Sequence, residues 1–180
     1  MSSKKQSKKK PNSPNTQSTS KKFKVTPEML KNGDVLCGLV IRFLHNRTKE
    51  NMFSLLSCLR DSNVFVPSTI SADPTMTEVG GKGDNPIMFP VKQSLKITPQ
   101  IYKATDGNLY IPIYSRQENV RPENLKGASL VNMPYTECLK ILKNAEGCSR
   151  FVLDPHLYNV VLDEDLVRIS GQLPSRLSTQ

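Results

Sequence analysis

Residues 98–114, TPQIYKATDGNLYIPIY, contain the clearest β-hairpin pattern in the chain. Two runs rich in β-forming residues, 98–104 and 109–114, flank Asp106-Gly107, and this dipeptide supplies the positive φ angles of a tight hairpin turn. Pro112 stands inside the second run and has no N–H to donate to a neighbouring strand. The sequence therefore predicts a hairpin in which Pro112 marks an edge position or a bulge.

Two amphipathic helices are predicted before the hairpin. Apolar residues recur at helical spacing over 36–44, with Asp34 as the capping residue, and again over 52–59, with Thr48 as the N-cap. A short strand is expected at 63–67, because this run is rich in β-branched and aromatic residues.

The stretch between this strand and the hairpin has little periodicity. Residues 68–86 contain Pro74 and several glycines, so we expect a mobile surface loop, followed by a strand at 87–91. The run Gly80-Gly81-Lys82-Gly83 follows no apolar strand and precedes no helix. It therefore lacks the context of a phosphate-binding loop and is interpreted as part of the flexible loop.

The elements predicted after the hairpin are short and closely spaced. They are strands at 129–133, 150–153 and 159–162, a helix from Pro134 to Ala145 that ends at Gly147, and an acidic-started helical turn at 163–167. Strands interrupted by few helices do not give the regular alternation of a doubly wound sheet. The predicted fold is α+β: one domain over 25–170, with a mixed, mostly antiparallel sheet, helices packed on it, and a frayed tail at 171–180.

Positive charge is concentrated at the N-terminus. The chain has 25 basic and 16 acidic residues, a net charge of +9, whereas residues 25–180 have 17 basic and 16 acidic residues, a net charge of +1. Residues 1–24 hold too few apolar residues to offset the entropy of ordering them, so we expect a disordered tail. The candidate polyanion-binding residues are its eight lysines: Lys4, Lys5, Lys8, Lys9, Lys10, Lys21, Lys22 and Lys24.

The cysteines and apolar runs indicate a soluble, cytoplasmic protein. Cys37, Cys58, Cys138 and Cys148 form no C-x-x-C pair, and no apolar segment follows the N-terminal lysines as in an export signal. No run of about 18 apolar residues is present, so no membrane span is expected.

Residues suited to catalysis or metal binding are sparse. His45 and His156 are far apart in sequence, and neither has a second ligand at helical spacing, so we expect no metal site and no cofactor. Cys148 and His156 are the one candidate nucleophile and base that lie close in sequence. A cleft near this pair is the enzyme alternative, although structural roles for both residues are the simpler interpretation.

The layout from Leu36 to Leu166 resembles the N-terminal domain of the SseB family, a bacterial family named for an enhanced serine sensitivity phenotype. The resemblance rests on a strand ending in Val66-Pro67, on a hairpin with a polar turn and a proline in its second strand, and on a closing strand–helix–strand block over 128–162. Asp154-Pro155 stands where the family usually has Asn-Pro. The resemblance implies an α+β fold and brings no catalytic residues.

We therefore expect a non-catalytic domain that acts as a protein-interaction or regulatory module. Its binding surface would be a helix face or a sheet edge, such as the edge expected near Pro112. Two alternatives remain open. The tail binds nucleic acid or an anionic surface weakly and without sequence preference, or the chain is an enzyme with a cleft near Cys148 and His156.

Overall fold

The computed structural model of the chain describes residues 26–73, 76–78, 88–90 and 94–177. Its helices are α1 (Pro27–Lys31), α2 (Asp34–His45), α3 (Lys49–Asp61), α4 (Tyr135–Lys143) and α5 (Glu164–Gln172). Its strands are β1 (Asn63–Asp73), β2 (Met76–Glu78), β3 (Met88–Pro90), β4 (Ser94–Pro99), β5 (Tyr102–Lys103), β6 (Leu109–Ile113), β7 (Ser129–Pro134), β8 (Cys148–Leu153) and β9 (Val160–Leu162). Two 3₁₀ turns, η1 (Gln117–Asn119) and η2 (Pro122–Asn124), lie between β6 and β7.

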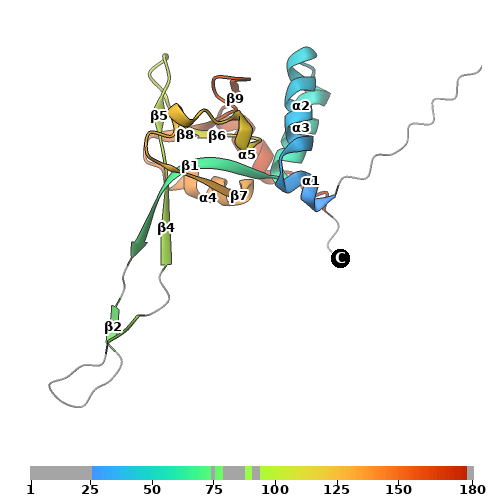
Figure 1. Cartoon of the computed structure of the whole chain (residues 1–180). Coiled ribbons are helices and arrows are strands. Elements are labelled where there is room, and N and C mark those ends of the chain that lie inside the picture. The colour runs from blue at the N-terminus through green and yellow to red at the C-terminus, as the bar shows by residue number, and fades with distance from the viewer. Residues whose placement is uncertain (1–25, 74–75, 79–87, 91–93, 178–180) are drawn as a thin grey trace, which may run out of the picture.

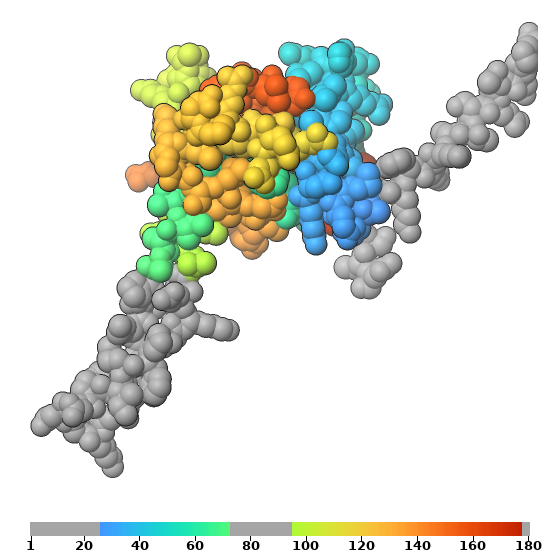
Figure 2. Space-filling view, viewed as in Figure 1, coloured from blue at the N-terminus to red at the C-terminus, as the bar shows by residue number. Residues whose placement is uncertain are grey.

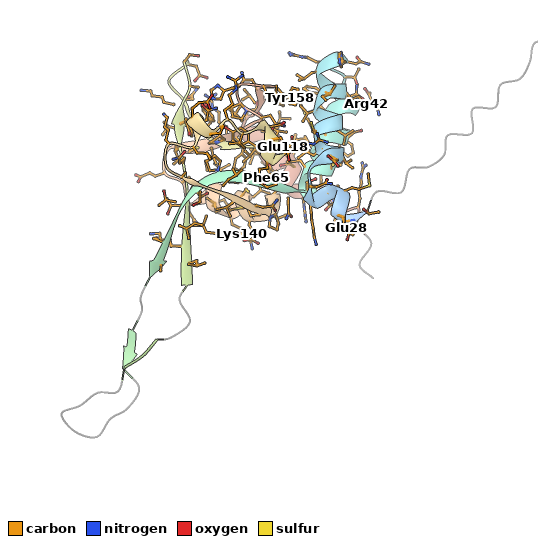
Figure 3. The ribbon with its side chains drawn as sticks, viewed as in Figure 1. Glu28, Arg42, Phe65, Glu118, Lys140 and Tyr158 are labelled. Atoms are coloured by element: carbon orange, nitrogen blue, oxygen red, sulfur yellow. The ribbon has the colours of Figure 1, made fainter. Side chains whose placement is uncertain are left out.

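Two sheets form the body of the domain. Strands β4, β1 and β7 make an antiparallel sheet in that order, and β5, β6, β8 and β9 make a second sheet in which only β6 and β8 are parallel. The sheets meet where Phe65 of β1 and Tyr114 exchange two backbone hydrogen bonds of 2.9 Å. Phe65, labelled in Figure 3, lies where β1 crosses the body. The predicted α+β class is confirmed.

Helices and both sheets contribute to one hydrophobic core. α2 and α3 stand side by side at one end of the body, and α4 lies along the first sheet (Figure 1). The helices predicted over 36–44 and 52–59 are confirmed. The fully buried core side chains include Leu36, Val40, Leu55, Leu59, Val64, Ile111, Ile113, Phe151, Leu153 and Leu162.

The two predicted helix caps have different outcomes. Thr48 caps α3, since its hydroxyl accepts a hydrogen bond from the Asn51 N–H at 3.2 Å. The assignment of Asp34 is wrong: Gly33 holds the N-cap position of α2, and Asp34 is the first helical residue. Gly33 has φ +79°, a conformation that glycine adopts without the steric cost of a Cβ.

The predicted hairpin exists, but its first arm is short. β5 pairs with β6 through Tyr102 opposite Tyr110 and Lys103 opposite Leu109. The beginning of the predicted arm belongs instead to β4, which pairs with β1. Within the turn dipeptide only Gly107 has positive φ, at 84°, so the predicted pair of positive angles is wrong.

Pro112 lies in the interior of the second sheet. β8 flanks it on one side, where it stands opposite Val152, and the pairing shifts register between Leu109 and Ile111. The irregularity thus precedes Pro112 and does not include it. The edge interpretation is wrong, because β6 lies between β5 and β8 in the strand order. Pro112 is also buried, so this part of β6 offers no exposed edge to a partner.

The loop predicted over 68–86 is wrong at its start. Residues 68–73 continue β1 and pair with β4, and 76–78 form β2. The remaining residues of that stretch, including Gly80-Gly81-Lys82-Gly83, lie outside the described part of the chain. The strand predicted at 87–91 is β3, which pairs with β2.

The C-terminal region contains more regular secondary structure than the sequence predicted. The strands expected at 129–133, 150–153 and 159–162 are present, and the expected helical turn is a full helix, α5, capped by Asp163. Leu173 packs on the core, and the Arg176 N–H donates to the Asp61 carboxylate at 2.7 Å. α5 thus ends at Gln172, beyond the predicted domain end at residue 170, and residues 178–180 lie outside the described part.

A buried polar cluster joins the C-terminal ends of β6 and β8. The fully buried Asp154 carboxylate accepts hydrogen bonds from the Ser115 N–H (2.9 Å), the Ser115 hydroxyl (2.7 Å) and the Asn119 amide (3.0 Å). Burial raises the pKa of Asp154, and these hydrogen bonds oppose the shift. The backbone at Ser115 also lies against Gly33, so the cluster connects the sheet to the start of α2.

Candidate partner-binding site

The structure does not bring Cys148 and His156 together. Cys148 is the first residue of β8 and lines a depression of about 530 Å³ beside α4 and α5. His156 is exposed in the turn that follows the other end of β8. At strand spacing, the length of β8 from Cys148 to that end is roughly 16 Å. A cleft shared by these two residues, which the enzyme alternative required, is therefore absent from the described residues.

Burial also affects the thiols. The four cysteines are free, and burial raises the pKa of Cys58, Cys148 and Cys138, in the last case to about 12. A raised pKa lowers the fraction of thiolate, which is the nucleophilic form. No group of three or more His, Cys, Asp or Glu side chains suited to a metal converges in the described ranges.

The most unusual surface is a two-stranded extension of the first sheet. We call residues 69–72 of β1 and 95–98 of β4 the β1–β4 ribbon. β7 pairs with β1 only up to Ser68, so beyond that point the described sheet is two strands wide. Figure 1 shows the ribbon leaving the body, and Figure 2 shows its green atoms standing clear of the domain surface.

The two faces of the ribbon have different chemistry. Residues directly opposite each other in an antiparallel pair share a face. One face carries Ile70 opposite Ile97 and Ala72 opposite Leu95, whereas the other carries Thr69 opposite Thr98 and Ser71 opposite Lys96. The ribbon therefore has one apolar face without charge and one polar face.

The apolar face continues the core into solvent. Val64 and Val66 of β1 are buried, and Ile70 lies on the same face because strand side chains alternate with a period of two. Ile97 is half-buried and packs against the core. Further out, Ile70 is 46% exposed and Leu95 is 63% exposed. A surface of core-like composition is thus left uncovered by the described residues.

Other features of the described surface are less suited to a partner. A depression of about 510 Å³ between α1, α2 and α3 is partly closed by Arg176 and Leu177. The large exposed apolar side chains on the helices are Ile41 on α2, Phe53 on α3 and Ile169 on α5, one on each helix. Single exposed apolar residues are normal on protein surfaces. No helix in the described ranges has the length and apolar composition needed to cross a bilayer.

The polyanion-binding residues predicted from the sequence are not part of the β1–β4 ribbon. All eight tail lysines precede residue 26 and lie outside the described residues. Sequence reasoning missed the ribbon, because Pro74 and the following glycines suggested a loop. The signal that could have found it is the period-two alternation of Val64, Val66, Ile70 and Ala72.

Comparison with known proteins gives one match. A family model described as "SseB protein N-terminal domain" matches residues 39–168, a range that includes the ribbon. No curated protein and no solved structure matches the chain.

Proposed function

The chain belongs to the SseB protein N-terminal domain family, and we propose that it acts as a non-catalytic protein-interaction module that docks a partner on the β1–β4 ribbon. The observation that carries the proposal is the exposed apolar face of Ile70, Ala72 and Leu95. An isolated two-stranded ribbon is marginally stable in water. A partner that covers this face would stabilise it.

The expected gain from covering the face is appreciable. Fully burying one large aliphatic side chain contributes about 1.5–3 kcal/mol, and Ile70 and Leu95 are each about half exposed. Two such side chains would together contribute roughly 1.5–3 kcal/mol to docking. Charges are confined to the polar face, at Lys96, so no ionised group needs to lose its water when the apolar face is covered.

Photo-crosslinking tests this proposal. A benzophenone amino acid placed at Leu95 is expected to capture one recurrent protein in cells that make the chain, because Leu95 lies on the docking face. Adding Ile70→Lys to the same chain should lower the yield at least about tenfold, since a buried ammonium without a partner is costly. Mass spectrometry of the adduct provides the measurement.

The matched control is the same photo-reactive group at Phe53, which is 49% exposed on α3. It should not capture the protein that Leu95 captures. An identical set of adducts at both positions, unaffected by Ile70→Lys, would mean that the ribbon is not a docking surface.

A second candidate function, polyanion binding, is favoured by the charge of residues 1–24. Their eight lysines attract phosphates, whereas the rest of the chain has a net charge of +1. Deleting residues 1–24 should abolish binding to duplex DNA, and the full chain should show a salt slope of about −0.9 per phosphate contact. Fluorescence titrations at two salt concentrations measure this. Tight, salt-insensitive binding by the deletion variant would contradict it.

We also propose a bacterial cytoplasmic location. Four free thiols suit a reducing compartment. The family that the sequence resembles is a bacterial one. Fractionation of cells that make the chain would test this.

A further inference from the structure

We propose that the ribbon's partner adds an extended strand, antiparallel to β1, along the edge of residues 70–72 that no described strand pairs with, which we call the open edge. This inference rests on the proposed docking function and specifies its mode. The new strand would continue the line of β7, which ends at Ser129 opposite Ser68.

Hydrogen bonds nearer the body fix which backbone groups face this edge. The N–H and C=O of Phe65 bond Tyr114, and the Pro67 carbonyl accepts from the Gln100 N–H, so these odd-numbered residues direct their polar groups to the β4 and β6 side. Backbone polar groups alternate along a strand, and the pairing of β1 runs without a register shift. Ile70 and Ala72 therefore direct their N–H and C=O groups to the opposite side, where β7 has ended and no other strand of the described ranges pairs with β1.

The two edges of the ribbon differ in protection. Natural sheets protect their edges with lysine and proline, and the β4 edge contains both Lys96 and Pro99. The β1 edge over residues 69–72, Thr-Ile-Ser-Ala, contains neither. The open β1 edge is therefore the better template for strand addition.

The geometry also specifies the chemistry of the ligand. In an antiparallel pair, the residues opposite Ile70 and Ala72 would exchange hydrogen bonds with them and share their apolar face. The ligand is thus an extended peptide with apolar residues at two positions separated by one polar residue. Main-chain hydrogen bonds supply affinity, and the alternate apolar side chains supply selectivity.

A synthetic peptide provides the test. The probe is capped Ser-Thr-Val-Thr-Val-Thr-Ser, titrated into the full ¹⁵N-labelled chain and followed by NMR. We expect saturable shifts at the amides of Ile70 and Ala72 that exceed those at Leu95 and Ile97. N-methylation of both valines should weaken binding at least about tenfold, because it removes the N–H groups that face β1.

The matched control is N-methylation of the threonines on either side of the first valine, whose N–H groups face away from β1. It should change affinity less than about twofold. In the protein, Ala72→Pro should reproduce the loss while Ala72→Val retains binding, and the methylated peptides keep the test valid if Ala72→Pro perturbs folding.

Two outcomes would overturn this inference. Absence of saturable shifts at Ile70 and Ala72 is one, and equal weakening by both methylated peptides is the other. Neither affects the docking proposal itself, which fails separately if Ile70→Lys leaves photo-crosslinking at Leu95 unchanged.

Discussion

Replacing Gly33 by alanine is expected to unfold the domain or to lower its free energy of unfolding by more than about 4 kcal/mol. A Cβ built at Gly33 would lie 1.6 Å from the Ser115 carbonyl oxygen, which belongs to the backbone and cannot rotate away. The φ of +79° adds strain for any residue with a Cβ. Since a domain has only about 5–15 kcal/mol of stability, a loss of this size is large.

Gly38→Ala is the matched control for this prediction. Gly38 lies inside α2, and nothing comes within 4 Å of a Cβ built there. Alanine should therefore stabilise the helix by about 0.5–1 kcal/mol. Urea unfolding followed by circular dichroism measures both variants. A Gly33→Ala variant as stable as the parent would contradict the close approach of α2 to Ser115.

Replacing Asp154 by alanine is expected to cost about 3–5 kcal/mol. The change removes the acceptor of three hydrogen bonds and leaves the donors of Ser115 and Asn119 without it. Alanine is also disfavoured at the φ of +50° that aspartate tolerates. Asp165→Ala, at an exposed ion pair with Arg168, should change stability by less than about 0.5 kcal/mol. An Asp154→Ala variant of parental stability in urea unfolding would show that the cluster is dispensable.

The buried carboxyl of Asp154 should also make the free energy of unfolding depend on pH. Burial raises the pKa of its carboxyl in the folded chain, so the neutral form is favoured there more than in the unfolded chain. Stability should therefore fall as pH rises from the ordinary aspartate value of about 3.9 to the raised value in the folded state. The difference in unfolding free energy between parent and Asp154→Asn, measured against pH, isolates this effect. A difference that grows with pH would mean that the hydrogen bonds from Ser115 and Asn119 outweigh burial.

The sequence correctly predicted those elements whose formation depends on residues close to one another in the chain. The helices α2 and α3, the cap at Thr48 and the turn at Gly107 follow from spacing and turn chemistry within a few residues. The errors arose where distant segments pair. Residues 68–73 become a strand because β4 lies beside them, and Pro112 is interior because β8, some forty residues later in the chain, pairs with β6.

The candidate site was only partly predictable for the same reason. A sheet edge was expected to bind a partner, but it was placed near Pro112, which is buried. The exposed surface lies instead at Ile70 and Leu95, whose opposition across two strands depends on the register of β1 with β4. Register is fixed by tertiary packing, and a single sequence does not display it.

Amide hydrogen exchange tests the docking surface most directly. The chain is compared alone and in complex with the protein captured through Leu95. We expect the amides of Ile70 and Ala72 to become protected in the complex, while those of α2 and α3 keep their exchange rates. Protection confined to α2 and α3, with the ribbon amides unchanged, would contradict the assignment of the β1–β4 ribbon as the docking surface.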